Sequence, residues 1–225
     1  MERKRVFTEE ELSEMGRQTA DVIEQSIDAG DSQKAKKLTR RMYREFLAMH
    51  DLYRDWVTAL LTFIGTHYGD EVLYQALKEG CSSWLKPLNE LYADKDIRRK
   101  VELLAAGLRG HLQPLEIKED DEKFILLMHP CGSGGRLVLD GSYMPPRNFM
   151  RVKKAQTMTY GREDFPVYCA HCPFQEIVPI ELTGIPLFIT VPPAKPGEEP
   201  CQIYLYKDPT AIPTELYQRV GKRKP

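Results

Sequence analysis

The sequence predicts an α+β protein in which a helical N-terminal part packs on a smaller, β-rich, metal-bound C-terminal part. Two observations support this fold class. Apolar residues recur every three or four positions through residues 1–112, which is the period of amphipathic helices. From residue 113 onward, short apolar runs alternate with prolines and polar turns, which is typical of strands. We expect the parts 1–112 and 113–225 to be two domains or two layers of one continuous domain.

The first part is predicted to be a bundle of four or five helices. Thr8 and Glu11 have the residue types and the spacing of a capping box, which satisfies free N–H groups at a helix start. Gly30 is a typical residue just past a helix end. The predicted helices cover about residues 9–29, 32–69, 70–80, 84–91 and 96–110. Because helices joined by short turns pack antiparallel, these segments should form a bundle.

The second predicted helix carries a stripe of large apolar side chains at alternating spacings of three and four residues. Its members are Leu38, Met42, Phe46, Met49, Tyr53, Trp56, Leu60 and Phe63. Every amphipathic helix needs such a stripe, so we interpret it first as core. Two alternatives remain open: the stripe lines a ligand pocket, or it pairs with a second copy of the chain in a homodimer.

The second part is predicted to contain two hairpins, one further strand and a short terminal helix. Strands are expected at about residues 115–118, 123–128, 136–139, 185–191 and 202–207. The first two flank the polar turn 119–122, and the last two flank the proline-rich loop 192–200, so each pair is typical of a hairpin. The terminal helix should follow Pro213 and stop at Gly221.

The main functional signal is a set of cysteines and histidines in the second part. Cys131 follows His129 in the segment HPC, and Cys169 and Cys172 form a C-x-x-C with His171 between them. Thiolate and imidazole are donors that zinc prefers, and four of them converging tetrahedrally form a closed site. We therefore predict bound zinc, with iron as the alternative. The predicted metal ligands are His129, Cys131, Cys169 and Cys172.

The fourth ligand decides what the metal does. If His129 completes the set, no coordination position stays open and the site is structural. His171 and Cys201 are the alternatives for that position. If three cysteines bind alone, a water molecule occupies the fourth position and the metal can support hydrolysis.

A glycine-rich loop follows Cys131 directly. Three glycines in four residues let the backbone turn sharply and bring N–H groups close to a neighbour. Those groups can stabilise a metal-bound thiolate or hold an anion, with Arg136 as a bidentate partner for a carboxylate or phosphate. The predicted substrate-binding residues are Gly132, Ser133, Gly134, Gly135 and Arg136. A tight turn around a structural metal is the alternative explanation.

Together these residues favour a small-molecule enzyme, a metal-dependent hydrolase or lyase with an anionic substrate. In that interpretation His171 and Glu176 are candidate acid–base residues, and Arg136 anchors the substrate. One alternative is a non-catalytic, zinc-stapled module that binds a ligand or a protein. Another is a thiol or redox protein that uses Cys169 and Cys172.

The composition excludes several classes of partner. The chain has 225 residues with 32 Lys and Arg against 33 Asp and Glu, so its net charge of −1 favours neither nucleic acid nor an anionic membrane. No apolar run approaches the roughly 20 residues of a membrane span. The N-terminus is charged and lacks the apolar segment of a signal peptide. We therefore expect a cytoplasmic protein, where cysteines are more typical of metal or redox sites than of disulfides.

Overall fold

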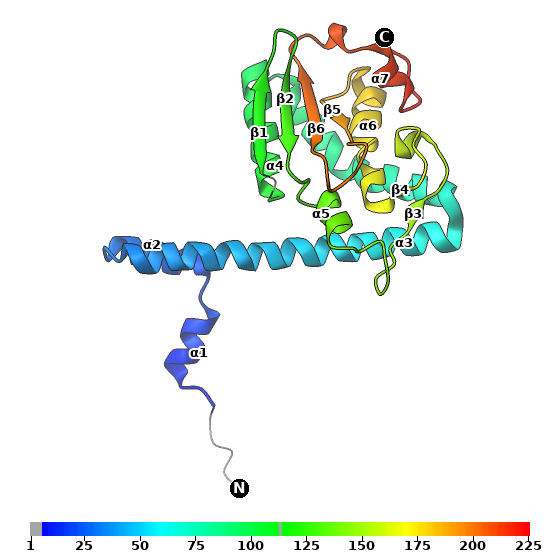
Figure 1. The fold of residues 1–225 in the computed structure, drawn as a ribbon. Coiled ribbons are helices and arrows are strands. Elements are labelled where there is room, and N and C mark those ends of the chain that lie inside the picture. Colours follow the sequence, from blue (N-terminus) through cyan, green and yellow to red (C-terminus); the bar gives the residue numbers. More distant parts are fainter. Residues whose placement is uncertain (1–5, 113) are drawn as a thin grey trace. The chain divides into compact units, whose positions relative to one another are not determined.

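The computed structural model describes residues 6–112 and 114–225. Its helices and its small antiparallel sheet confirm the predicted α+β class (Figure 1). The chain divides into two compact units, one ending at Tyr53 and the other beginning at Arg54. The sheet and all five cysteines belong to the second unit.

The first unit is helical. α1 covers Glu9–Gly16, α2 covers Thr19–Asp28, and α3 (Ser32–Ala93) begins in this unit. The predicted capping box is present: Thr8 Oγ1 accepts a hydrogen bond from Glu11 N at 3.1 Å, and the Glu11 carboxylate accepts one from Thr8 N at 2.8 Å. This reciprocal pair explains why α1 begins at the predicted position.

The predicted first helix is in fact two helices. The backbone of Arg17 is extended, with φ −75° and ψ 142°, and Gln18 has ψ 134°. Gly16, just before this break, has a low helix propensity. The Arg17 guanidinium donates hydrogen bonds to Glu14 in α1 and to Gln25 in α2, which stabilises the break from both sides.

α3 contains the next three predicted helices. Gly69 has φ 81° and ψ 178°, so helical geometry breaks there as predicted, in a conformation that favours glycine. The predicted end at Gly80 is wrong, because a buried apolar stripe runs through that position. Its members are Leu73, Leu77, Cys81 and Leu85, at most 5% exposed. Their packing outweighs the penalty of about 1 kcal/mol for a glycine inside a helix.

The apolar stripe earlier in α3 is not core. Its side chains from residue 42 to residue 63 are 41% to 56% exposed: Met42, Phe46, Met49, Tyr53, Trp56, Leu60 and Phe63. In the second unit, the buried face of this helix is formed by other residues, including Thr58 and Leu61. The interpretation of the stripe as core is therefore wrong, and the ligand-pocket and homodimer alternatives stay predictions.

A four-stranded antiparallel sheet forms the centre of the β-rich part. Its strands are β1 (Leu115–Glu119), β2 (Lys123–Met128), β5 (Ile189–Val191) and β6 (Cys201–Tyr206). Their spatial order is β1-β2-β6-β5. Both predicted hairpins are confirmed, although the second begins later than expected, at Ile189.

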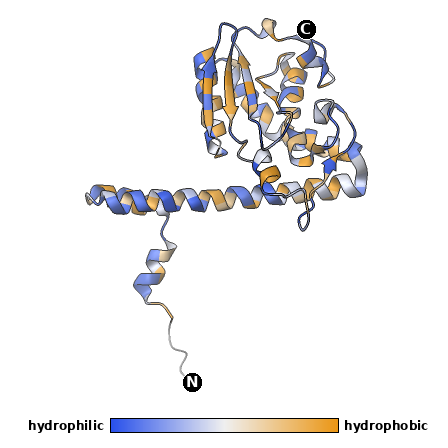
Figure 2. Ribbon diagram, in the orientation of Figure 1, coloured by the Kyte–Doolittle hydropathy of each residue, from blue (hydrophilic) through white to orange (hydrophobic). Residues whose placement is uncertain are grey.

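α4 (Ile97–Gly110) packs against this sheet. It starts as predicted at Asp96, whose carboxylate accepts a hydrogen bond from Arg99 N at 2.8 Å. Leu104 and Ala105 of α4 belong to one buried cluster with residues of β2 and β6. In Figure 2, β2 is hydrophobic along most of its length, while the edge strand β1 is mixed. Charged residues on an exposed edge discourage pairing with other chains.

The strand predicted at residues 136–139 is a helix. α5 covers Gly134–Leu139, and its first turn is closed by Arg136 N donating to Cys131 O and Leu137 N donating to Ser133 O. A short apolar run does not by itself distinguish a strand from a short buried helix. Here Leu137 is fully buried, so packing selects the helix.

The C-terminal part also contains elements that the sequence analysis missed, above all α6 (Phe174–Thr183). Pro179 in its interior argues against a helix, yet α6 packs on the second half of α3, where the Tyr74 and Phe174 rings lie 4.9 Å apart. The predicted terminal helix is confirmed as α7 (Thr214–Gln218). The remaining short elements are β3 (Arg151–Val152), η1 (Thr157–Thr159), β4 (Phe165–Pro166), η2 (Val167–His171) and η3 (Pro209–Ala211).

The helices of the described ranges are amphipathic or short. α3, the longest, alternates hydrophilic and hydrophobic residues along its length (Figure 2). Among the residues that the structure describes, no helix combines the length and the apolar character needed to cross a membrane.

Candidate functional site

Two cavities in the second unit share a wall of four cysteines. The larger, of about 110 Å³, and the smaller, of about 40 Å³, are both lined by Cys131, Cys169, Cys172 and Cys201. We call the larger one the cysteine cavity. The fifth cysteine, Cys81, is buried in α3 and lines neither of them.

These cysteines come from three separate segments. Cys131 lies in the loop between β2 and α5, and Cys169 lies in η2, with Cys172 directly after it. Cys201 is the first residue of β6, where it pairs with Met128, the last residue of β2. This register brings Cys201 next to the loop that carries Cys131, three residues beyond Met128.

The glycines after Cys131 allow close packing around the cavity. A Cβ atom on Gly134 would lie 2.6 Å from Cys169 Sγ, and one on Gly132 would lie 2.4 Å from the carbonyl oxygen of His111. A Cβ on Gly135 would lie 3.2 Å from Cys131 Cβ. Real Cβ atoms do not approach other atoms within 3 Å, so a side chain at position 132 would collide with the backbone and one at position 134 would force Cys169 Sγ to move. Close packing therefore accounts for these two glycines without any bound anion.

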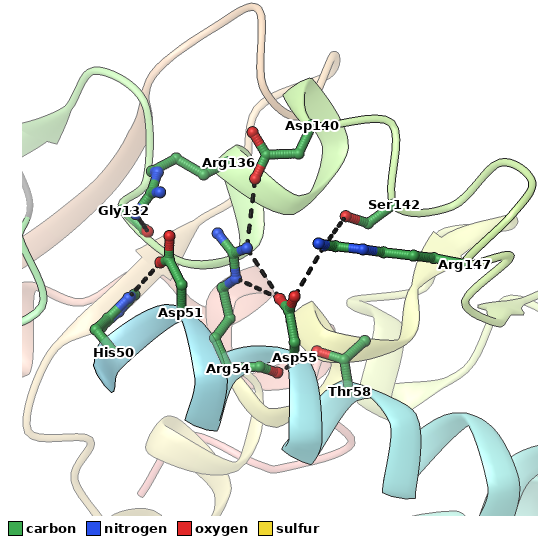
Figure 3. Close-up of polar contacts among 10 residues, drawn as sticks. All are labelled: His50, Asp51, Arg54, Asp55, Thr58, Gly132, Arg136, Asp140, Ser142 and Arg147. Carbon is green, nitrogen blue, oxygen red and sulfur yellow. Dashed lines mark hydrogen bonds and ion pairs between the residues drawn. The ribbon is translucent and has the colours of Figure 1, made fainter. Parts of the chain in front are cut away.

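Of the predicted substrate-binding loop, Ser133 and Gly134 line the cysteine cavity and Gly135 lines the smaller one. Arg136 lies outside both linings, on α5, and its Nη1 donates a hydrogen bond to Gly132 O at 3.3 Å (Figure 3). The structure thus does not bring the Arg136 guanidinium to the cysteines.

Figure 3 also shows ion pairs, centred on the buried Arg54, that hold α5 and the following loop to α3. Arg54, only 4% exposed, pairs with Asp55 at 2.9 Å and with Asp140 at 3.3 Å. Arg147 pairs with Asp55 at 2.9 Å and donates a hydrogen bond to Ser142 Oγ at 3.0 Å. These pairs position the elements around the glycine-rich loop.

His171 contributes an imidazole to the cysteine cavity. Its Nδ1 lies 2.6 Å from Tyr168 O, and because a carbonyl oxygen only accepts, Nδ1 carries the proton. Nε2 therefore keeps its lone pair, 3.8 Å from Cys172 Sγ. Burial lowers the pKa of His171, so the neutral ring is favoured.

His111, which the sequence analysis did not single out, lines the same cavity. It follows the last residue of α4, and its Nδ1 lies 2.9 Å from Gly107 O, one turn back. The sequence signal was weak, because a single histidine after a helix end is common. Only the packing of the glycine-rich loop on this helix end brings it to the cysteines.

Three of the cavity thiols, those of Cys169, Cys172 and Cys201, are held in the neutral form. Burial, with Cys131 nearby, raises the pKa of Cys169 to about 12. Burial also raises the pKa values of Cys172 and Cys201 well above that of an ordinary thiol. A neutral thiol is a poor nucleophile, so without a bound cation these residues are not activated for thiol chemistry.

His129, a predicted metal ligand, lies outside both linings. Its side chain is 49% exposed, and its Nε2 is 3.8 Å from a carboxylate oxygen of Glu116 on the neighbouring strand β1. Cys201, which the sequence analysis left as an alternative fourth ligand, lines both cavities together with Cys131, Cys169 and Cys172.

Glu176, a predicted acid–base residue, is completely buried in α6. Its carboxylate accepts hydrogen bonds from Tyr160 Oη at 3.0 Å, Thr190 N at 2.8 Å and Arg219 Nη2 at 2.8 Å and 2.9 Å. Burial raises the pKa of Glu176 to about 7, against the lowering effect of Arg219 and the other donors. Glu176 lies outside both cavity linings.

The donor types around the cysteine cavity fit a thiophilic metal, but the donor atoms are not preassembled. Within residues 6–112 and 114–225, no three Cys, His, Asp or Glu side chains are already grouped to hold a metal ion. Sulfur atoms would have to turn to reach the roughly 2.3 Å that zinc requires. Comparison with protein-family models, with curated proteins and with solved structures gives no match to this chain.

Proposed function

We propose that the protein binds a thiophilic metal ion, zinc or iron, through Cys131, Cys169, Cys172 and Cys201. The observation that carries this proposal is that four of the five cysteines, from three separate segments, line the same cavity. Thiolate is the donor that zinc and iron prefer in proteins. Four such ligands fill a tetrahedral metal completely and form a closed, structural site.

A structural metal suits this part of the fold. The cysteines come from loops and short elements: the turn before α5, the 3-10 helix η2 and the start of β6. Such segments contain little regular secondary structure. Cross-linking them through a metal therefore stabilises the folded state directly. In this role the protein is a metal-stapled module that serves a ligand or a protein partner.

A second function, a metal-dependent hydrolase or lyase, is favoured by the space beside the cysteines. The cysteine cavity has a volume of about 110 Å³, and His111 and His171 line it together with the thiols. If one cysteine stays unbound, a metal-held water can occupy the fourth position, and the neutral His171 ring can accept its proton at Nε2. A small substrate then binds at the metal rather than at Arg136.

Elemental analysis of the full-length chain, purified without added metal and again after loading with zinc or iron, tests the proposal. Single Cys→Ser variants at positions 131, 169, 172 and 201 are compared with Cys81→Ser as the matched control. We expect close to one metal per chain in the unchanged protein and in the control, and at least a tenfold loss in each site variant.

Cobalt substitution separates the two functions. Thiolate-to-cobalt absorption grows with the number of bound thiolates, so it shows whether four cysteines or three hold the metal. Four bound thiolates support the structural site, and three support the catalytic one. Equal metal content in the site variants and in Cys81→Ser, or a protein that takes up neither metal, contradicts both.

A further inference from the structure

A separate cavity of about 370 Å³ lies in the second unit, away from the cysteines. It is formed by the end of α3, the first turns of α4, the segment between α6 and β5, and the end of β6. It shares no lining residue with either cavity of the cysteine wall. Its volume lies in the range of small-molecule binding sites.

The walls of this cavity are rigid and mostly apolar. Tyr92, Phe188, Ile189 and Ile212 line it and are at most 6% exposed, so they belong to the packed interior. Side chains fixed in a core do not have to be ordered when a ligand binds. The cavity therefore offers an apolar surface at a low entropic cost.

The charged groups of the lining are both positive. Lys100 on α4 and Lys207 after β6 line the cavity, and no lining residue is acidic. The Lys207 ammonium is already paired with Glu119 at 2.7 Å. Lys100 is half-buried as a residue, and within the part of the chain that the structure describes its ammonium makes no hydrogen bond and no ion pair. An ammonium without a partner at the edge of an apolar cavity is available to form a charge-assisted hydrogen bond with an anion.

A polar neutral group accompanies Lys100. Asn89 of α3 lines the same cavity and is also half-buried, and among the described residues its amide makes no side-chain hydrogen bond. An amide N–H and an ammonium together can hold the two oxygens of a carboxylate. The rest of the lining matches an apolar body.

We propose that this cavity binds a small amphipathic carboxylate. The carboxylate lies at Lys100 and Asn89, and the aliphatic or aromatic body lies among Tyr92, Phe188 and Ile212. This site is independent of the proposed metal site, because the two have no residue in common.

Isothermal titration of the full-length protein with octanoate tests the site, and octanamide serves as the neutral probe of equal length. We expect saturable binding of octanoate with one site per chain, and binding of octanamide weaker by about tenfold or more, since a charge-assisted hydrogen bond is lost. Lys100→Gln should weaken octanoate about tenfold and leave octanamide unchanged.

Lys86→Gln is the matched control, because it removes the same charge from an exposed position of α3 outside the cavity. Its octanoate affinity should equal that of the unchanged protein. Thermal unfolding of both variants verifies that they are folded. The proposal is overturned if octanoate does not bind, if octanamide binds equally well, or if the two lysine variants bind octanoate alike.

Discussion

Two buried polar regions of the second unit adjoin at Thr190 but differ in how their groups are partnered. Thr190 N donates to Glu176, while the same residue lines the cysteine cavity. The Glu176 carboxylate accepts hydrogen bonds of 2.8 Å to 3.0 Å from Tyr160, Thr190 and Arg219. Its bonding capacity is met by the protein itself.

The cysteine cavity is the opposite case. Cys172 Sγ is 3.8 Å from His171 Nε2, and Cys201 Sγ is 3.8 Å from Val191 O, which are long and weak contacts. A buried group whose capacity is filled stabilises the fold, whereas donors with only weak contacts can bind something else. The difference teaches that burial and an altered pKa alone do not identify a functional residue.

The largest effect on stability is expected for replacement of Glu176, whose hydrogen-bonding capacity is filled by the protein. Glu176→Ala removes the fully buried carboxylate and leaves the Arg219 guanidinium, only 18% exposed, without its charge partner, which should lower the free energy of unfolding by about 3–5 kcal/mol. Glu181→Ala is the matched control on the same helix, because Glu181 pairs with Lys78 and Lys222 at the surface and should cost at most about 1 kcal/mol. Urea unfolding measures both. Equal losses of unfolding free energy in the two variants would show that the Glu176–Arg219 pair contributes no more than a surface ion pair. The contrast between the two regions would then not hold.

The pH dependence of stability sharpens the same contrast. The pKa of Glu176 is raised from its ordinary 4.5 to about 7, so between these values the folded state binds more protons than the unfolded state. Stability should therefore fall as pH rises through that window, by at most about 1.4 kcal/mol per pH unit, and level off above it. Glu176→Gln should abolish this contribution. Urea unfolding between about pH 5 and pH 8 measures it, and parallel profiles for the two proteins would show that Arg219 holds the carboxylate ionised throughout.

A smaller loss of stability is expected for a substitution in the wall of the cysteine cavity. Gly134→Ala places a Cβ 2.6 Å from Cys169 Sγ, so that thiol must move, at a cost of about 1–3 kcal/mol. Metal content should fall in parallel, because the displaced sulfur is a proposed ligand.

Gly107→Ala in α4 is the control for this substitution. No atom lies within 4 Å of its added Cβ, so it should stabilise the helix by up to about 1 kcal/mol. Thermal unfolding and elemental analysis compare the two variants. A Gly134→Ala protein as stable and as metal-rich as Gly107→Ala would contradict the packing of the glycine-rich loop on Cys169.

Much of the fold was readable from local patterns. The capping box at Thr8, the cap at Asp96, the break at Gly69 and the hairpin of β1 and β2 are all where the sequence predicts them. Each depends on residues within a few positions of one another. The C-x-x-C and Cys131 were also singled out from spacing alone.

Where local patterns failed, packing between distant segments decided the outcome. Gly80 lies inside a helix because the buried stripe of α3 continues through it, and residues 136–139 are helical because Leu137 is buried. The helix α6 forms around Pro179 for the same reason, since its apolar face packs on α3.

By itself, the sequence determined the elements with strong local signals and the residue types available for metal chemistry. Only the tertiary structure decided which of those residues meet. The pairing of Met128 with Cys201 brings Cys201 to the cavity wall, while His129, just past the end of β2, is directed toward Glu116. The physical reason is that convergence on one cavity depends on strand register and on side-chain direction, which are set by contacts far apart in the chain.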